Sequence, residues 1–472
     1  MYDVKSKKAE EFINDGEILK SLEFAEKNKN NNELVMEILK KASLKKGISH
    51  AEAAVLLLNE DDKVKEQVFA LAKEIKHEFY GNRIVLFAPL YLSNYCVNGC
   101  VYCPYHHKNS CIARKKLSQE DIEKEVIALQ DLGHKRLAIE SGEDPVNNPL
   151  EYILDSIKTI YSVKHKNGAI RRVNVNIAAT TVENYRKLKE AEIGTYILFQ
   201  ETYHKPTYLE LHPTGPKHNY DYHTEAMDRA MEGGIDDVGL GVLFGLNLYK
   251  YELVGILMHA EHLEASFGWG PHTISVPRIC PAEGIDVDGF DNAVPDEIFE
   301  KIVAILRVAV PYTGIIMSTR ESQKMREKAL GLGVSQVSGG SKTSVGGYAE
   351  EEEEDDNSKQ FDISDTRTLD EVVAWLVKNN HIPSFCTACY KLGRTGDRFM
   401  SLVKSGQIKN VCQPNALMTL KEYACDYASD KTKSVIEAMI KAEIEKVPNE
   451  KAREVAKTNL ALIENGERDF RF

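Results

Sequence analysis

Eight short apolar runs, rich in β-branched residues, recur through the middle of the chain, and amphipathic helical patterns separate them. The runs read IVLFAPL, RLAIE, RVNVNIA, TYILFQE, DVGLGVLFG, HTISVPRI, TGIIMST and SQVSGG. One of the separating helices is predicted to begin at Ser118, because acidic residues fill its first turn. Strands that alternate with helices favour a parallel sheet, and eight such repeats predict an α/β fold, a (β/α)8 barrel of TIM type.

Composition divides the chain around this barrel. Residues 1–82 are charged and helical in periodicity, which predicts an N-terminal helical extension, and residues 83–347 form the barrel. Residues 348–364 contain the acidic tract from Glu350 to Asp356, whose like charges predict a solvated linker. Residues 365–472 are predicted to form a C-terminal helical domain that carries a second group of cysteines.

The bulk composition narrows the function classes. The 472 residues include 60 basic and 72 acidic side chains, and the net charge of −12 argues against a nucleic-acid binder. No run approaches the length of a membrane span, and the N-terminus lacks the apolar core of a signal peptide. Nine cysteines in such a chain indicate metal ligands in a reducing compartment. These features predict a cytoplasmic enzyme that interacts with neither nucleic acid nor membrane.

Cys96, Cys100 and Cys103 form a C-x3-C-x2-C triplet directly after the first predicted strand. A [4Fe–4S] cluster normally takes four cysteine ligands, so three thiolates leave one iron open to a small molecule. Active sites of such barrels lie at the carboxyl ends of the strands, where this triplet falls. A zinc site that recruits His106 or His107, or a set of ordinary buried thiols, are the alternatives.

The spacing of this triplet resembles that of the radical-SAM superfamily. The resemblance implies that the open iron binds S-adenosylmethionine (SAM) through its amino and carboxylate groups, and that an electron from the cluster yields a 5′-deoxyadenosyl radical. It also implies a set of SAM contacts: Tyr102 against adenine, the SGED segment with Ser141, Gly142 and Glu143 at the methionine amino group, Glu201 in QETYH, and either His223 or Arg229 at the carboxylate. A tight turn at Gly142 would give the same SGED letters. Arg229 is preferred over His223 because a guanidinium can pair with a carboxylate through two hydrogen bonds.

Arg320, in the segment STRES, ends the seventh predicted strand. An arginine that points into an enclosed barrel mouth needs an anion, and a substrate carboxylate would supply one. An internal salt bridge to a neighbouring acid is the alternative. Ser338 and Ser341 in the SGGS segment are expected to add hydroxyl contacts at this rim, unless the two glycines between them only form a turn.

Several longer segments resemble one branch of the superfamily, the aromatic amino-acid lyases. The segments are SNYCVNGCVYC, QETYH, LELHPTGPKHNYDYH, DDVGLGVLFGL, STRES and SGGS. This branch includes the tyrosine lyase of thiamine thiazole synthesis and the tyrosine-cleaving maturases of [FeFe]-hydrogenase. The resemblance implies cleavage of the Cα–Cβ bond of L-tyrosine to p-cresol and dehydroglycine. Arg320 would hold the tyrosine carboxylate, and Tyr95 would contact the substrate beside the cluster.

A second triplet, Cys386, Cys389 and Cys412, has the spacing C-x2-C-x22-C. Three thiolates again suit a cubane with an open iron, and a zinc knuckle completed by His381 is the alternative. Only the maturases in the branch are expected to share this triplet. The resemblance implies an auxiliary [4Fe–4S] cluster with a dangling fifth iron, bridged by free L-cysteine, that converts dehydroglycine to CO and cyanide.

His272 opens the sixth predicted strand, so it should lie at the bottom of the barrel, opposite the SAM site. The resemblance implies that it ligates the dangling iron, whereas a lone histidine would otherwise be read as a hydrogen-bonded loop residue. The three remaining cysteines, Cys111, Cys280 and Cys425, are read as ordinary thiols.

The predicted function is therefore a tyrosine lyase that makes an Fe(CO)2(CN) precursor for the H-cluster. Its expected partners are L-tyrosine, SAM, L-cysteine, Fe2+, an electron donor such as ferredoxin or flavodoxin, and other hydrogenase maturases. The alternatives are a simple 2-iminoacetate synthase of the thiazole pathway and a non-catalytic iron–sulfur scaffold.

Overall fold

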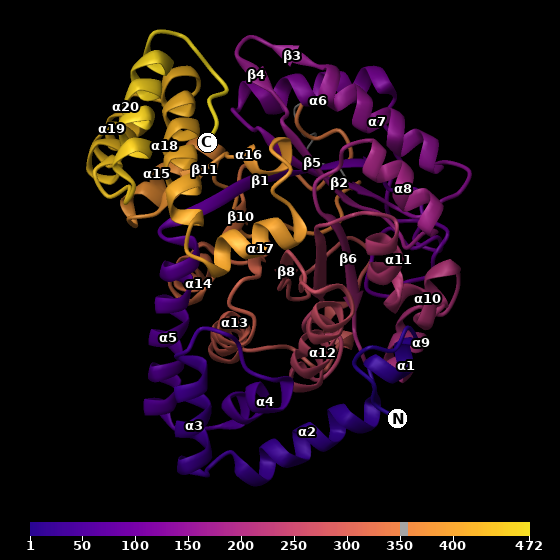
Figure 1. The fold of residues 1–472 in the computed structure, drawn as a ribbon. Coiled ribbons are helices and arrows are strands. Elements are labelled where there is room, and N and C mark those ends of the chain that lie inside the picture. Colours follow the sequence, from indigo (N-terminus) through magenta and orange to yellow (C-terminus); the bar gives the residue numbers. More distant parts are fainter. Residues whose placement is uncertain (350–356) are drawn as a thin grey trace.

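Eight parallel strands close into a barrel in the computed structural model, which confirms the predicted fold class (Figure 1). The structure describes residues 1–349 and 357–472, so the acidic tract predicted to be a solvated loop lies outside the described residues. Strand β1 pairs with β2 on one side and with β10 on the other, and this last pairing closes the sheet. The barrel strands are β1 (Arg83–Ser93), β2 (Arg136–Ser141), β5 (Arg172–Asn176), β6 (Tyr196–Glu201), β7 (Val238–Val242), β8 (Thr273–Ser275), β9 (Gly314–Met317) and β10 (Gln336–Ser338).

Helices connect successive strands, as the alternation of patterns predicts. The helix predicted to begin at Ser118 does so, because Ser118 and Asp121 form a capping box that satisfies two free backbone N–H groups. The connecting helices are α6 (Gln119–Asp131), α7 (Leu150–Ser162), α8 (Val182–Glu190), α9 (Lys205–Leu211), α10 (Tyr220–Thr224), α11 (Ala226–Glu232), α12 (Tyr249–Phe267), α13 (Asp296–Ala309) and α14 (Gln323–Leu332). A two-stranded hairpin, β3 (Lys164–His165) and β4 (Gly168–Ala169), follows α7.

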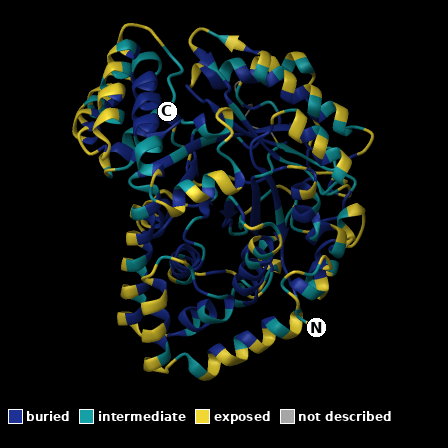
Figure 2. Ribbon diagram, in the orientation of Figure 1, coloured by how far each residue is buried: buried dark blue, intermediate teal, exposed yellow. Residues whose placement is uncertain are grey.

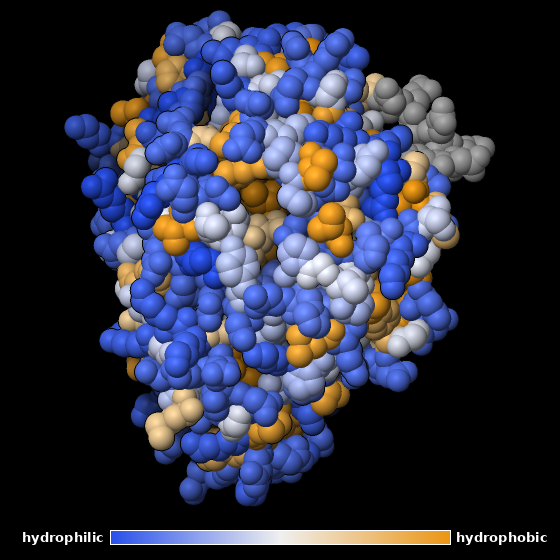
Figure 3. All heavy atoms as spheres, turned by 90° about the vertical axis from the view of Figure 1, so that its right-hand side faces the viewer, coloured by the Kyte–Doolittle hydropathy of each residue, from blue (hydrophilic) through white to orange (hydrophobic). Residues whose placement is uncertain are grey.

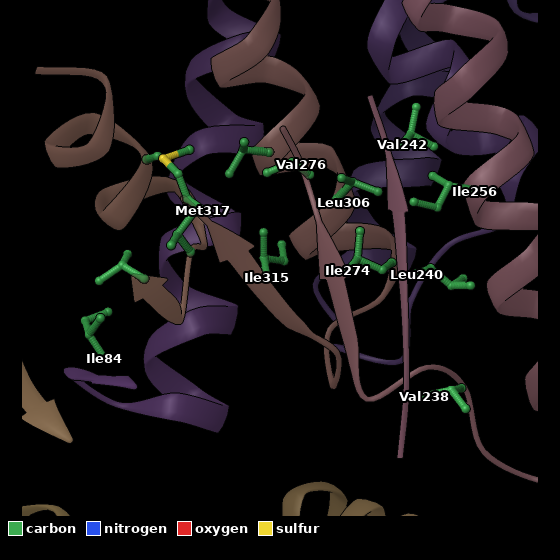
Figure 4. Close-up of a cluster of buried hydrophobic side chains, with 14 of the residues drawn as sticks. Ile84, Val238, Leu240, Val242, Ile256, Ile274, Val276, Leu306, Ile315 and Met317 are labelled. Atoms are coloured by element: carbon green, nitrogen blue, oxygen red, sulfur yellow. The ribbon is translucent and has the colours of Figure 1, made fainter. Parts of the chain in front are cut away.

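Side chains at matching levels of neighbouring strands form the core between barrel and helices (Figure 4). Leu240 on β7 pairs in register with Ile274 on β8, which pairs with Ile315 on β9. All three are buried, and Figure 4 shows them near Ile256 of α12 and Leu306 of α13. Parallel strands with helices outside and a bore inside are covered on both faces, which explains their nearly unbroken apolar sequences.

The N-terminal segment forms five helices that cover the outside of α12 and α13 (Figure 1). The helices are α1 (Ala9–Phe12), α2 (Asp15–Asn28), α3 (Asn32–Ala42), α4 (His50–Leu58) and α5 (Asp62–Tyr80). Their outward faces are exposed whereas the strands are buried, as Figure 2 shows. Helix α5 ends at Gly81, whose positive φ turns the chain into β1.

The C-terminal segment contains a short strand, β11 (Ile382–Ser384), that the sequence analysis did not predict. It pairs in parallel with the start of β1, through Arg83 with Ile382 and Val85 with Ser384. Three residues that include a proline give too weak a strand signal to detect in a sequence. The other elements are helical, as expected: α15 (Leu369–Lys378), α16 (Ala388–Lys391), α17 (Gly396–Lys404), α18 (Ile408–Asp426), α19 (Asp430–Ile444) and α20 (Glu450–Glu464).

A buried carboxylate fastens α18 to the barrel. Glu422 accepts a hydrogen bond from Arg171 at 2.9 Å and from the backbone N–H of Asp469 at 2.7 Å, and Lys135 Nζ lies 3.2 Å away. Burial alone would raise the pKa of Glu422, but Arg171 and Lys135 hold it below its ordinary value. The group is therefore ionised at neutral pH and compensates two buried cations.

We expect Glu422→Gln to lower the free energy of unfolding by about 3 kcal/mol, because it leaves Lys135 buried without a counter-charge and leaves Arg171 with Asp469 alone. Urea denaturation followed by tryptophan fluorescence measures this loss. Since the folded-state pKa of Glu422 is depressed, its contribution is complete above the unfolded-state pKa of about 4.3 and fades as the pH falls below it.

The matched control is Glu445→Gln, which breaks an exposed pair with Lys457. This change should leave the free energy of unfolding close to that of the wild type, because solvent screens an exposed pair. Equal losses from the two variants would show that the buried network does not stabilise the docking of α18.

Candidate active site with two cysteine-lined cavities

The loop between β1 and α6 carries the first cysteine triplet, and Arg114 holds it in shape. The guanidinium of Arg114 donates to four backbone carbonyls, at distances between 2.7 and 3.3 Å. These acceptors are the carbonyl oxygens of Asn94, Tyr105, His106 and Asn109. Arg114, which is half-buried, therefore fixes the loop on both sides of the triplet, where regular secondary structure is absent.

Cys96, Cys100 and Cys103 line an upper cavity of about 190 Å3 at the carboxyl ends of the strands. Burial raises the pKa of Cys103 to about 12 and raises that of Cys100 as well. Thiols with such pKa values become thiolates only beside a strong positive charge, which cluster irons would supply. The donor set thus fits a cubane held by three cysteines.

The SGED segment lies against the triplet. A Cβ atom on Gly142 would stand 2.3 Å from the carbonyl oxygen of Tyr95, so only glycine allows this approach. The backbone N–H of Val97 donates to the carbonyl of Glu143, and Asn98 Nδ2 donates to the Glu143 carboxylate at 2.6 Å. Ser141, Gly142 and Glu143 all line the upper cavity, and burial raises the pKa of Glu143.

Glu201 occupies the left-handed region, with φ of 68°, at a bulge where β6 ends against β7. Its carboxylate lies 2.8 Å from Lys217 Nζ, and the ammonium also lies 5.8 Å from the centre of the Tyr102 ring. Burial alone would lower the pKa of Lys217, but the Glu201 carboxylate raises it, so the lysine is charged. Tyr102, Glu201 and Lys217 all line the upper cavity. Sequence reasoning missed Lys217, because its position in the loop after α9 gives no periodic signal.

The two residues considered for the SAM carboxylate lie differently. His223 lines the upper cavity, and its Nε2 is 2.9 Å from the carbonyl oxygen of Phe199. Burial lowers the pKa of His223 to about 3, so the ring is neutral. Arg229, the preferred candidate, is not among the described residues that line this cavity, and it donates to the carbonyls of Thr180 and Tyr222.

Arg320 lines the upper cavity as expected. Its Nη1 donates to Cys280 Sγ at 3.2 Å, and its guanidinium lies 3.6 Å from the centre of the Phe361 ring. Within the described residues it has no carboxylate partner, which leaves the internal salt bridge without support. Cys280 also lines the cavity, a position that the sequence analysis did not predict for it.

Three predicted rim residues lie elsewhere. Tyr95 is absent from the described lining of the upper cavity, and its carbonyl accepts a hydrogen bond from Asn148. Ser338 and Ser341 are buried, with hydroxyls that have no partner in the described residues. Ser338 follows Gln336 by two residues on β10, and because strand side chains alternate, both face the same side. Since Gln336 lines the lower cavity described next, Ser338 belongs to the bore and not to the rim.

Strand β2 connects the two ends of the barrel. Glu140, near its carboxyl end, lines the upper cavity, and Arg136, at its start, lines a second cavity. The two residues are four positions apart along the strand, which corresponds to about 13 Å and places both side chains on one face. Burial raises the pKa of Glu140 to about 8. The two cavities therefore lie at opposite ends of one bore.

The lower cavity, of about 90 Å3, gathers Cys386, Cys389 and Cys412. His272 also lines it, directly before β8, at the position that the strand direction predicted. Its ring lies 5.0 Å from that of Phe399, and its Nδ1 is buried without a hydrogen-bond partner among the described residues. Burial lowers the pKa of His272, which keeps the imidazole in the neutral form that binds metals.

Within the second triplet, only Cys412 lies in surroundings that favour its thiolate, since the pKa values of Cys386 and Cys389 are raised. A hydrogen bond from Cys389 lowers the pKa of Cys412 to about 6, and Arg83 and Arg394 act in the same direction. Burial raises the pKa of Cys386 to about 11. His381, the residue considered for a zinc knuckle, is absent from the described lining, and its Nδ1 lies 3.5 Å from Lys76 Nζ. Within the described residues, no three His, Cys, Asp or Glu side chains converge closely enough to hold a single metal ion, whereas the cysteines of a cubane each bind a different iron and stand farther apart.

The face of the molecule drawn in Figure 3 is hollowed, with hydrophobic residues at the floor of the hollow and mostly hydrophilic residues around it. Across residues 1–349 and 357–472, none of the helices combines the length and apolar character that crossing a membrane requires.

Comparison with known proteins agrees with this architecture. Residues 90–257 match the radical SAM superfamily, and residues 275–382 match the biotin and thiamin synthesis associated domain. A 2-iminoacetate synthase of Salmonella typhimurium is 31% identical over 316 residues, which cover 66% of this chain and 80% of that protein.

Two solved structures extend the match over nearly the whole chain. A crystal structure of HydG, a maturase of the [FeFe]-hydrogenase, is 58% identical, with a TM-score of 0.95, and the match covers 98% of this chain and all of that one. The HydG maturase from Carboxydothermus hydrogenoformans is 38% identical, with a TM-score of 0.83, over 96% of this chain and 99% of that one. The chain is a radical-SAM lyase and belongs to the family of the HydG maturases of [FeFe]-hydrogenase.

Proposed function

We propose that this enzyme cleaves L-tyrosine at its upper site to p-cresol and dehydroglycine. It then converts dehydroglycine at its lower site to CO and cyanide, in an Fe(CO)2(CN) precursor of the H-cluster. The observation that carries this proposal is the presence of two cysteine triplets in separate cavities at opposite ends of one barrel. A product made at one mouth could reach the other without contact with bulk water, which would hydrolyse it.

The upper residues have distinct tasks. Cys96, Cys100 and Cys103 would hold a [4Fe–4S] cluster, which with SAM bound would supply the radical chemistry that removes hydrogen from the substrate amino group. Glu143 accepts hydrogen bonds from the SAM amino group, and Tyr102 lies against adenine. Arg320, which has no carboxylate partner among the described residues, holds the tyrosine carboxylate through a charge-assisted contact.

At the lower site, Cys386, Cys389 and Cys412 would hold the auxiliary [4Fe–4S] cluster, and neutral His272 would ligate a fifth iron. Free L-cysteine and Fe2+ complete this site, and ferredoxin or flavodoxin supplies electrons. Other hydrogenase maturases receive the product. The cytoplasm, where thiols stay reduced, is the compartment that suits nine free cysteines.

The similarity to 2-iminoacetate synthase supports a second candidate, a tyrosine lyase that stops at dehydroglycine. Infrared bands of enzyme-bound CO after turnover would exclude it. A non-catalytic iron–sulfur scaffold would release no deoxyadenosine when it is incubated with reductant, SAM and tyrosine.

We assign the SAM carboxylate to Lys217 in place of Arg229, since Lys217 lines the upper cavity beside Glu201. Lys217→Met should raise the Kd for SAM of the reconstituted protein at least about tenfold, because a buried charge-assisted contact is lost. Equilibrium dialysis with labelled SAM measures this.

Arg229→Met is the matched control and should change this Kd by less than about threefold, because its guanidinium contacts backbone carbonyls. The double variant E201Q/K217M removes the unpaired carboxylate as well and should still bind weakly. A larger effect from Arg229→Met than from Lys217→Met would return the assignment to Arg229.

Replacement of both Cys386 and Cys389 by serine should leave p-cresol formation intact and abolish bound CO, since only the lower site loses ligands. Chromatography and infrared spectroscopy measure the two products. Cys425→Ser, which lies outside the described lining of both cavities, should change neither. Loss of SAM cleavage in the variant that lacks Cys386 and Cys389 would contradict the assignment of separate reactions to the two cavities.

His272→Ala should spare p-cresol and both four-iron clusters but deplete the fifth iron, because its neutral imidazole is the only histidine among the described residues of the lower cavity. Electron paramagnetic resonance of the dangling iron and total iron content report this. An unchanged five-iron signal would rule His272 out as its ligand.

A further inference from the structure

The lower cavity contains an excess of buried cations. Arg83, Arg136 and Arg394 line it, and Asp237 is the single acidic residue in its described lining. Asp237 is already engaged, since it accepts a hydrogen bond from the N–H of Gly396 at 3.1 Å and lies 3.6 Å from His272. A cubane held by three thiolates would be a small net anion, so it would offset part of this charge but not all of it.

Two of these cations, Arg136 and Arg394, have an Nε without a partner among the described residues, and Arg136 is the more deeply buried of the two. Its side chain is buried, with 6% of the residue exposed, and its Nη2 donates to the carbonyl of Cys386 at 2.9 Å. Its Nε has no partner in the described part of the chain. A buried guanidinium N–H without an acceptor costs free energy of desolvation. Native structures rarely leave such a donor unpaired unless a water or a ligand supplies the acceptor.

Neighbouring contacts fix Arg136 toward the cavity. It starts β2, on the inward face that also carries Glu140 at the upper mouth. Its guanidinium lies 5.5 Å from the centre of the Tyr390 ring, which also lines the lower cavity. Arg83, by contrast, donates to Gln413 at 3.2 Å and to the carbonyl of Phe79. The guanidinium of Arg136 therefore lies at the lower cavity, beside Cys386 of the second triplet.

We propose that Arg136 binds the carboxylate of a small α-amino or α-imino acid in the lower cavity. This inference rests on the proposed function, which brings two such acids to this site: dehydroglycine through the bore and free L-cysteine from solution. A planar guanidinium pairs with a carboxylate through two parallel hydrogen bonds, which would orient the acid as well as bind it. Arg136 is a binding and positioning residue in this assignment.

The test uses the anaerobically reconstituted full-length enzyme and equilibrium dialysis with labelled L-cysteine and labelled glycine, which stands in for dehydroglycine. Arg136→Lys keeps the charge but loses the fork, so affinity should fall at least about tenfold, the effect of losing a charge-assisted hydrogen bond. Iron and sulfide content, together with the thermal unfolding temperature, verify that the variant is assembled.

Arg172→Lys is the matched control. Arg172 also lies against the Tyr390 ring, at 3.7 Å, but it lines a surface groove and is absent from the described lining of the lower cavity. Its affinities should stay within about twofold of wild type.

The pattern of loss identifies the acid. Weaker binding of cysteine alone assigns the site to the free amino acid, weaker binding of glycine alone assigns it to the fragment, and loss of both shows a shared site. Wild-type protein that binds neither acid, or Arg136→Lys that binds both at full affinity, would overturn the inference.

A second measurement does not depend on the variant. Wild-type enzyme should bind L-cysteine amide and glycine amide at least about tenfold more weakly than the free acids, because the amides lack the carboxylate. Equal affinities would overturn the inference. If wild-type enzyme still forms p-cresol and bound CO, such a result would leave the proposed function intact.

Discussion

Closure of the barrel through hydrogen bonds between β1 and β10 is the constraint on which the two sites depend. An open sheet would leave an edge and two separate faces, whereas a closed one has an inside with two mouths. Strand alternation then places every second residue in the bore. Arg136 and Glu140 lie on one strand and one face, yet they belong to different cavities. The two cavities are separate because the rise per residue along a strand carries residues of one face to different ends of the bore.

Burial gives the groups at each mouth their chemical character. Cys100 and Cys103 in the upper cavity have raised pKa values, and Cys412 in the lower cavity has a lowered one because a thiol and two arginines face it. The two triplets therefore differ in their surroundings although they supply the same ligands. Cys100 and Cys103 at the upper site and Cys386 and Cys389 at the lower site need bound irons to ionise, whereas Cys412 has arginines beside it that favour its thiolate.

Much of the fold was predictable from sequence, because eight apolar runs at regular spacing leave few alternatives to a barrel. The triplets and His272 were also predictable, since spacing and strand direction locate them. Lys217 and the lower arginines were not, because each reaches its site through loop geometry or through the level of a strand residue within the bore. Arg229 was preferred because a guanidinium pairs well with a carboxylate, but the sequence did not show where its side chain lies. In the structure the guanidinium donates to backbone carbonyls. The strand β11 was missed because three residues carry almost no periodicity.

Strand β1 is long enough to pair with three other strands. Val85 pairs with Gln336 of β10 on one side and with Ser384 of β11 on the other, before β1 goes on to pair with β2. The backbone that closes the barrel thus also anchors the segment leading to Cys386. Attaching the C-terminal segment in this way requires a first strand that extends past its pairing with β10 at the amino end. A shorter lyase would need the same extended strand to accept the present C-terminal segment. Removal of the segment from this chain would leave the edge of β1 unpaired where β11 now covers it.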